Sequence, residues 1–117
     1  MRIAAHPTLL RRQIDARVRK LAAQRPVLGA SLVAIARHCG RPGCRCQRGF
    51  KHVAQYLTCK VEGKTRTVYV PKDLIGEVKR WIREHRRLKE LMREISQLVL
   101  ALVAGHVKAR RRRQDSC

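Results

Sequence analysis

The sequence predicts an α+β fold with an N-terminal helix, a small antiparallel β-sheet and a long C-terminal helix. Apolar residues recur at helical spacing near both ends of the 117-residue chain, which is typical of amphipathic helices. Between them, segments rich in Val, Tyr and Thr flank a glycine, as in a β-hairpin. This length suits one small domain. We expect it to divide into four segments, 1–28, 29–71, 72–105 and 106–117.

The first segment, 1–28, contains the first expected helix at residues 8–25. Thr8 has a hydroxyl that suits an N-cap, and Pro26 cannot continue a helix. One helical face holds four apolar residues, Leu10, Ile14, Val18 and Leu21. Arginines and lysines occupy the other faces, so we expect a basic helix.

The second segment, 29–71, is expected to form the antiparallel sheet. Residues 31–39 are predicted to be a strand, although their alanines leave a helix as an alternative. Residues 53–61 and 64–70 form the clearer pair of strands, because β-branched and aromatic residues dominate both. The Glu62-Gly63 pair between them suits a two-residue turn that needs positive φ.

The third segment, 72–105, is predicted to be one amphipathic helix roughly 50 Å long. Nine of its residues recur in steps of four and three, as in a coiled-coil heptad: Leu74, Val78, Trp81, His85, Leu88, Met92, Ile95, Val99 and Leu102. Four further apolar residues widen this stripe, which makes a packed helix an equal alternative: Ile75, Ile82, Leu91 and Leu98.

The length of this helix also predicts a partner. The first helix is too short to cover the apolar stripe along its whole length, so we expect a homodimer formed through residues 85–102. Gly105 is a natural helix end. The last segment, 106–117, is expected to be a disordered basic tail, because it contains a block of four arginines.

A cluster of cysteines and histidines interrupts the predicted sheet. The stretch HCGRPGCRCQRGFKH spans His38 to His52. Four potential ligands follow a C-x4-C-x-C-x5-H spacing, namely Cys39, Cys44, Cys46 and His52. Structural zinc takes four tetrahedral nitrogen and sulfur ligands, and Cys₃His is a standard set. Pro42-Gly43 and Gly49 would supply the turns that bring these ligands together. The pattern predicts a zinc knuckle inserted into the sheet.

Other interpretations of the cluster remain. It can be a basic loop with free thiols, or a redox pair at Cys44 and Cys46, although a C-x-C disulfide is strained. His38 is a reserve ligand if His52 does not bind. A nucleophilic cysteine with a histidine base would need an orienting acid, yet the chain has only eight acids, most of them on the long helix. We therefore expect a binding protein and not an enzyme.

The net charge of +20 is the strongest indication of function. Residues 1–51 hold twelve lysines and arginines against one acid, Asp15. A polyanion relieves the self-repulsion of such a chain, and each neutralised phosphate releases counterions. Nucleic acid is the expected partner, and an anionic membrane surface is a lesser alternative. Without an apolar run of about 18 residues or a recognisable signal peptide, we expect a cytoplasmic protein with reduced thiols.

The basic residues expected to bind nucleic acid fall into three groups. The knuckle contributes five, the first helix two and the tail four: Arg37, Arg41, Arg45, Arg48 and Lys51; Arg11 and Arg12; Arg110, Arg111, Arg112 and Arg113. We favour DNA over RNA, although charge alone does not distinguish them. RNA or ribosome association remains an alternative. A second alternative is an adaptor that binds a partner protein through the predicted helix 72–105.

Three motifs in this chain resemble one known family. These are CGRPGCRCQRG, VEGKTRTVYVPKDL and VKRWIREHRRLKELMREISQL. They resemble a family of small prokaryotic proteins described only as a domain of unknown function, and the resemblance covers residues 26–100. Members often lie beside mobile elements, so the resemblance implies a transposase as a possible partner class. It matches Cys39, Cys44, Cys46 and His52 to the family's knuckle and histidine. The family has a pair of adjacent tyrosines after this histidine, and this chain matches only one of them, with Tyr56.

Overall fold

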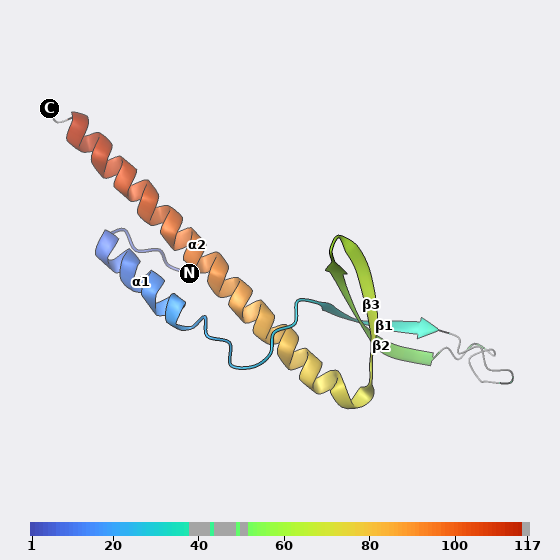
Figure 1. Cartoon of the computed structure of the whole chain (residues 1–117). Helices are drawn as coiled ribbons and strands as arrows, with labels where there is room; N and C mark the ends of the chain where they lie inside the picture. Colours follow the sequence, from blue (N-terminus) through green and yellow to red (C-terminus); the bar gives the residue numbers. More distant parts are fainter. Residues whose placement is uncertain (38–42, 44–48, 50–51, 116–117) are drawn as a thin grey trace. The chain divides into compact units, whose positions relative to one another are not determined.

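The computed structural model describes residues 1–37, 43, 49 and 52–115. Its elements follow in the order α1 (Pro7–Arg19), β1 (Ser31–Arg37), β2 (His52–Val61), β3 (Lys64–Val70), the short 3₁₀ helix η2 (Lys72–Leu74) and α2 (Ile75–Asp115) (Figure 1). The predicted α+β class with an antiparallel sheet is confirmed. In the described part of the chain, no helix combines the length and hydrophobicity that crossing a membrane requires.

The chain forms two compact units. The helical unit comprises Met1–Gln24 and Arg86–Cys117, and the sheet unit comprises Arg25–His85. Helix α2 therefore contributes its first turns to the sheet unit and its remainder to the helical unit.

The sheet unit contains three antiparallel strands in the order β1-β2-β3. The predicted hairpin turn is confirmed, since Glu62 has a φ of 52° and Gly63 a φ of 80°. Positive φ at both central residues is the signature of the two-residue turn that matches the twist of paired strands. This turn sets the register that places Tyr56 opposite Tyr69. Strand β1 then pairs with the other edge of β2, which excludes the helical alternative for this segment.

One face of the sheet packs on the start of α2. The buried core of the sheet unit is formed by Val70, Val78 and Ile82. Five half-buried side chains pack against it, namely Leu28, Leu32, Leu57, Ile75 and Trp81. The chain before β1 is held to the helix, because the backbone N–H of Leu28 donates to the carbonyl of Trp81 at 3.1 Å.

In the helical unit, α1 runs antiparallel to α2. The Arg17 guanidinium donates to the Glu94 carboxylate at 2.9 Å, with both side chains largely buried. At the end of α1, Arg87 donates to the carbonyl oxygens of Lys20 and Ala22, at 2.8 and 3.1 Å. These contacts tie the two helices together at two places, about two turns apart on α2.

Both predicted ends of the first helix are wrong. Helix α1 starts at Pro7, and its N-cap is His6, whose Nδ1 accepts from the backbone N–H of Thr8 at 3.2 Å. Its last residue is Arg19, well before Pro26. The carbonyls that follow are bonded by Arg87 on α2, so a tertiary contact satisfies them in place of a further helical turn.

The predicted end of the long helix is also wrong. Helix α2 continues through Gly105 to Asp115, so the basic segment 106–115 is helical and not disordered. A glycine inside a helix costs about 1 kcal/mol. Several good helix formers lie near Gly105, namely Ala101, Leu102, Ala104 and Ala109. Cations in the last turn also stabilise the negative end of the helix dipole.

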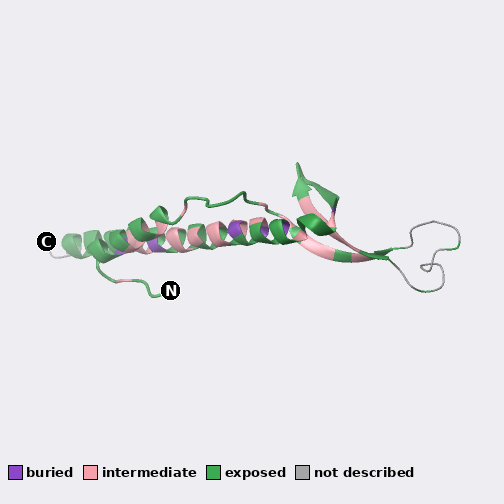
Figure 2. Cartoon of the chain, turned by 90° about the horizontal axis from the view of Figure 1, so that it is seen from below, coloured by how far each residue is buried: buried purple, intermediate pink, exposed green. Residues whose placement is uncertain are grey.

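The heptad places three exposed residues on its expected buried face, the first of them Leu74, which is 38% exposed. Met92 is 62% and Val99 40% exposed, whereas Leu98, which the heptad leaves outside its seam, is fully buried. The buried positions along α2 are visible in Figure 2. A straight helix drifts by about 20° per heptad relative to a 3.5-residue repeat, so one strict seam does not stay on one face.

Candidate nucleic-acid interface

The predicted zinc site falls mostly outside the described residues. Cys39, Cys44 and Cys46 lie there, as does the reserve ligand His38. His52 is the exposed first residue of β2 and pairs in register with Arg37, the last residue of β1. The segment between these two residues therefore leaves and rejoins the sheet at one place. Within the described part, no three potential metal ligands come together.

The predicted nucleic-acid residues are distributed between the two units. Arg11, Arg12 and Arg110 to Arg113 are exposed in the helical unit, and Arg37 is exposed in the sheet unit. The other predicted contacts lie outside the described residues, namely Arg41, Arg45, Arg48 and Lys51.

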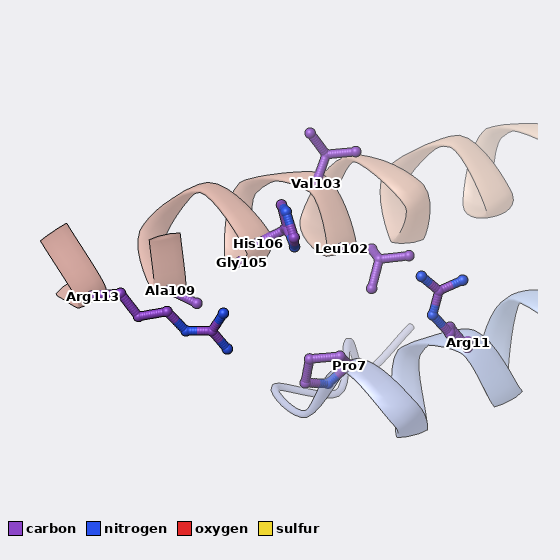
Figure 3. Close-up of a pocket in the computed structure, with 8 residues that line it drawn as sticks. All are labelled: Pro7, Arg11, Leu102, Val103, Gly105, His106, Ala109 and Arg113. Atoms are coloured by element: carbon purple, nitrogen blue, oxygen red, sulfur yellow. The ribbon is translucent and has the colours of Figure 1, made fainter. Parts of the chain in front are cut away.

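Two of these arginines, from opposite ends of the chain, meet in the helical unit. Arg11 of α1 and Arg113 of α2 line one open cavity of about 490 Å³, together with His106. Figure 3 shows the two arginines at either end of the cavity, with Pro7 of α1 across from α2. Its other lining residues are Leu102, Val103, Gly105 and Ala109, and none of the eight is acidic. We call this cavity the basic cleft.

Acids offset little of the charge around the basic cleft. The helical unit holds fifteen lysines and arginines and four acids. Glu94 pairs with Arg17, and Glu90 pairs with Arg93. The hydrogen bond from Arg93 lowers the pKa of the Glu90 carboxyl, and the same bond raises the pKa of Arg93. The field of this unit is therefore strongly positive.

The sheet face opposite α2 carries a second group of polar and aromatic side chains. The rings of Tyr56 and Tyr69 meet edge to face, with centroids 5.7 Å apart. The Arg37 guanidinium lies 5.0 Å from the centroid of the Tyr56 ring, as in a cation–π contact. Tyr69 is 55% exposed. We call these three residues the tyrosine platform.

A comparison with known protein families identifies the family of this chain. The family described as a domain of unknown function, DUF6788, matches residues 10–80. The chain belongs to the DUF6788 family. The predicted resemblance to an uncharacterised family is thus confirmed. No curated protein and no solved structure matches the chain.

The DUF6788 match includes one of the two candidate surfaces completely and the other only in part. It includes Arg37, Tyr56 and Tyr69, so the tyrosine platform lies wholly within the family domain. It ends before His106 and Arg113, which supply the α2 side of the basic cleft.

Sequence reasoning missed the tyrosine platform and His106 in this DUF6788 chain. A signal for the platform was available, because a two-residue turn at Glu62-Gly63 places Tyr56 directly opposite Tyr69. The position of His106 in the basic cleft depends on how α1 packs on α2. No local pattern in the sequence predicts that packing.

Proposed function

We propose that this chain is a small basic zinc-containing protein that binds nucleic acid in the cytoplasm, with DNA favoured over RNA. We place it as an accessory or regulator of mobile elements, acting by binding and not as an enzyme. One observation carries the nucleic-acid proposal. Two arginines that lie far apart in the sequence converge on one cleft that contains no acid.

The chemistry of the basic cleft suits a phosphodiester backbone. Arg11 and Arg113 each present a guanidinium, a group whose planar donors match phosphate oxygens. His106 also lines the cleft, between the two arginines. The first residue of α1, Pro7, also lines the cleft, so the positive end of the helix dipole adds to the field. Such contacts hold phosphates without selecting a base sequence.

Support for zinc comes from the sheet that flanks the knuckle. The strand ends at Arg37 and His52 are register partners, and directly opposed residues have Cα atoms about 5 Å apart. A predicted ligand thus starts the returning strand where the segment with the three cysteines closes. The donor set is three thiols and an imidazole, which is soft enough for zinc.

A salt titration tests the nucleic-acid proposal. At low salt, the full-length protein should bind a fluorescent DNA duplex, and log Kd should rise steeply with log salt because cations are released from DNA. Fluorescence anisotropy at 50 to 300 mM salt measures the slope, with a structured RNA as the parallel probe. A slope near zero on both probes would favour the adaptor alternative, in which α2 binds a protein such as a transposase.

Self-association is a separate proposal that rests on exposed apolar side chains of α2. Five of them follow one side of the helix and form what we call the apolar stripe: Met92, Val99, Leu100, Val103 and Val107. No lysine, arginine, aspartate or glutamate occurs between Glu94 and Lys108. A second copy can therefore pack here without burying a formal charge at the contact. The stripe overlaps the predicted 85–102 interval and extends beyond it.

Disrupting the apolar stripe should yield monomers. Leu100 is 70% exposed and Met92 62% exposed in the single chain, and neither lines the basic cleft, so replacing both with Glu should leave the fold intact and break the dimer. Burying one such side chain contributes about 1.5–3 kcal/mol. Light scattering at tens of micromolar measures the mass, with Gln97→Glu as the control on another side of α2. A monomeric wild type at that concentration would contradict the proposal.

A further inference from the structure

Aromatic residues are rare in this protein, and two of them, the half-buried Tyr56 and the exposed Tyr69, meet on one face of the sheet. The whole chain contains four aromatic residues. Tyr56 and Tyr69 contact each other edge to face, while Trp81 packs against the core of the sheet unit. Tyr69 leaves 55% of its surface exposed. The pair lies outside the buried core of the sheet unit, so the stability of that core does not explain it.

The pairing register determines which side chains surround this pair. Residues opposite each other and two apart along a strand share a face, so the face that carries Tyr56 and Tyr69 is the one turned away from Leu32, Leu57 and Val70. It also holds the cations Arg37 and Lys60, His52, four hydroxyl residues, Ser31, Thr58, Thr65 and Thr67, and three apolar residues, Val33, Ile35 and Ala54. None of the described residues on this face is acidic. The face therefore combines the tyrosine pair with cations and hydrogen-bonding hydroxyls, beside a small apolar group on β1 and β2.

This combination has a specific use in nucleic-acid recognition. Bases that are not paired stack on aromatic rings and on guanidinium planes, while nearby cations and hydroxyls contact the phosphates and sugars. Arg37 already lies against the Tyr56 ring, so a flat cation and two aromatic rings are held together before any ligand binds. Such preorganisation lowers the entropy cost of binding.

We propose that the tyrosine platform stacks the unpaired bases of single-stranded DNA. This inference rests on the proposed nucleic-acid binding and names its substrate class. Bases in a duplex are already stacked on one another and cannot reach a flat sheet face, so the platform discriminates by strand state. The basic cleft, in contrast, offers only phosphate contacts and does not discriminate. Single-stranded DNA occurs where a mobile element is cut or copied, which is consistent with the proposed role.

The test compares two variants of one exposed tyrosine. Tyr69→Ser removes the ring, whereas Tyr69→Phe retains it. Val68→Ser is the matched control, because Val68 is also exposed but lies on the other face of β3. Probes are a 20-nucleotide oligothymidine, an oligouridine of equal length and a duplex of equal length. Anisotropy measures each Kd, and thermal melting verifies that every variant folds.

The expected loss of affinity differs between the single-stranded and duplex probes. Tyr69→Ser should weaken oligothymidine binding by about tenfold or more, since one aromatic–base stack contributes that much, and should leave duplex binding within about twofold of the wild type. Tyr69→Phe and Val68→Ser should bind oligothymidine like the wild type. Equal losses on both DNA probes, or no loss on oligothymidine, would overturn the platform while leaving nucleic-acid binding intact.

Two further outcomes keep the proposals apart. A wild type that binds none of the three probes would refute the proposed function itself, and the platform with it. A wild type that prefers oligouridine, with the same loss in Tyr69→Ser, would support base stacking but overturn the assignment to DNA. If Tyr69→Ser melts early, the analogous change at Arg37, Arg37→Ala, provides the second measurement, because Arg37 is exposed and lies over Tyr56.

Discussion

Replacing Cys44 with Ser should release about one zinc ion per chain and lower the melting temperature sharply. Structural zinc contributes on the order of 10 kcal/mol to the folding of small domains. The buried core of the sheet unit is small, consisting of Val70, Val78 and Ile82, so little else would hold this unit together. Metal analysis of the purified protein and a thermal melt give the two readouts. The wild type should lose the same stability when a chelator removes the metal.

Matched controls identify the ligands. Cys117→Ser changes a thiol outside the predicted site and should keep both metal and stability. His52→Ala should lose zinc, whereas His38→Ala should retain it, because His38 is only the reserve ligand. A wild type that is fully stable without metal would rule out a structural zinc site. Zinc retained in His52→Ala and lost in His38→Ala would exchange the roles of the two histidines.

Removing the three knuckle arginines should cause the largest loss of nucleic-acid affinity. Replacing Arg41, Arg45 and Arg48 with Ala should cost several kcal/mol at low salt and flatten the log–log salt slope by up to about three units, roughly one per phosphate contact. Residues 1–51 contain most of the uncompensated charge, and zinc would hold these three side chains rigidly. Anisotropy titrations on a duplex and on a structured RNA measure both quantities.

The comparison variant changes the same number of charges elsewhere. Replacing Arg11, Arg12 and Arg113 with Ala alters the helical unit and leaves the knuckle intact. We expect a smaller loss from this variant, of similar size on every probe. If the knuckle variant binds as tightly as the wild type and the helical variant does not, the knuckle is a structural element and the basic cleft is the main phosphate site.

Local features of the sequence were sufficient for the element types. The hairpin followed from Glu62-Gly63, because a two-residue turn is specified by its own backbone preferences. The existence of both helices followed from apolar periodicity. The charge distribution follows from the sequence alone. The expectation of a polyanionic partner follows from that charge.

Tertiary contacts decided where the helices end and which of their faces are buried. Helix α1 stops at Arg19 because Arg87, distant in sequence, bonds the carbonyls that follow. Likewise Leu98 is buried and Met92 exposed because packing selects one side of an apolar helix that offers more than one. Local patterns give propensities, whereas these outcomes depend on contacts between residues far apart in the chain.

The same division applies to the candidate sites. Sequence alone predicts the ligand set of the proposed zinc knuckle and predicts Arg11, Arg37 and Arg113 as nucleic-acid contacts. Only the folded chain placed Arg11 and Arg113 in one cleft and set Arg37 over the Tyr56 ring. The physical reason is that a surface is formed by side chains from separate elements, and their proximity is established only when those elements pack and pair.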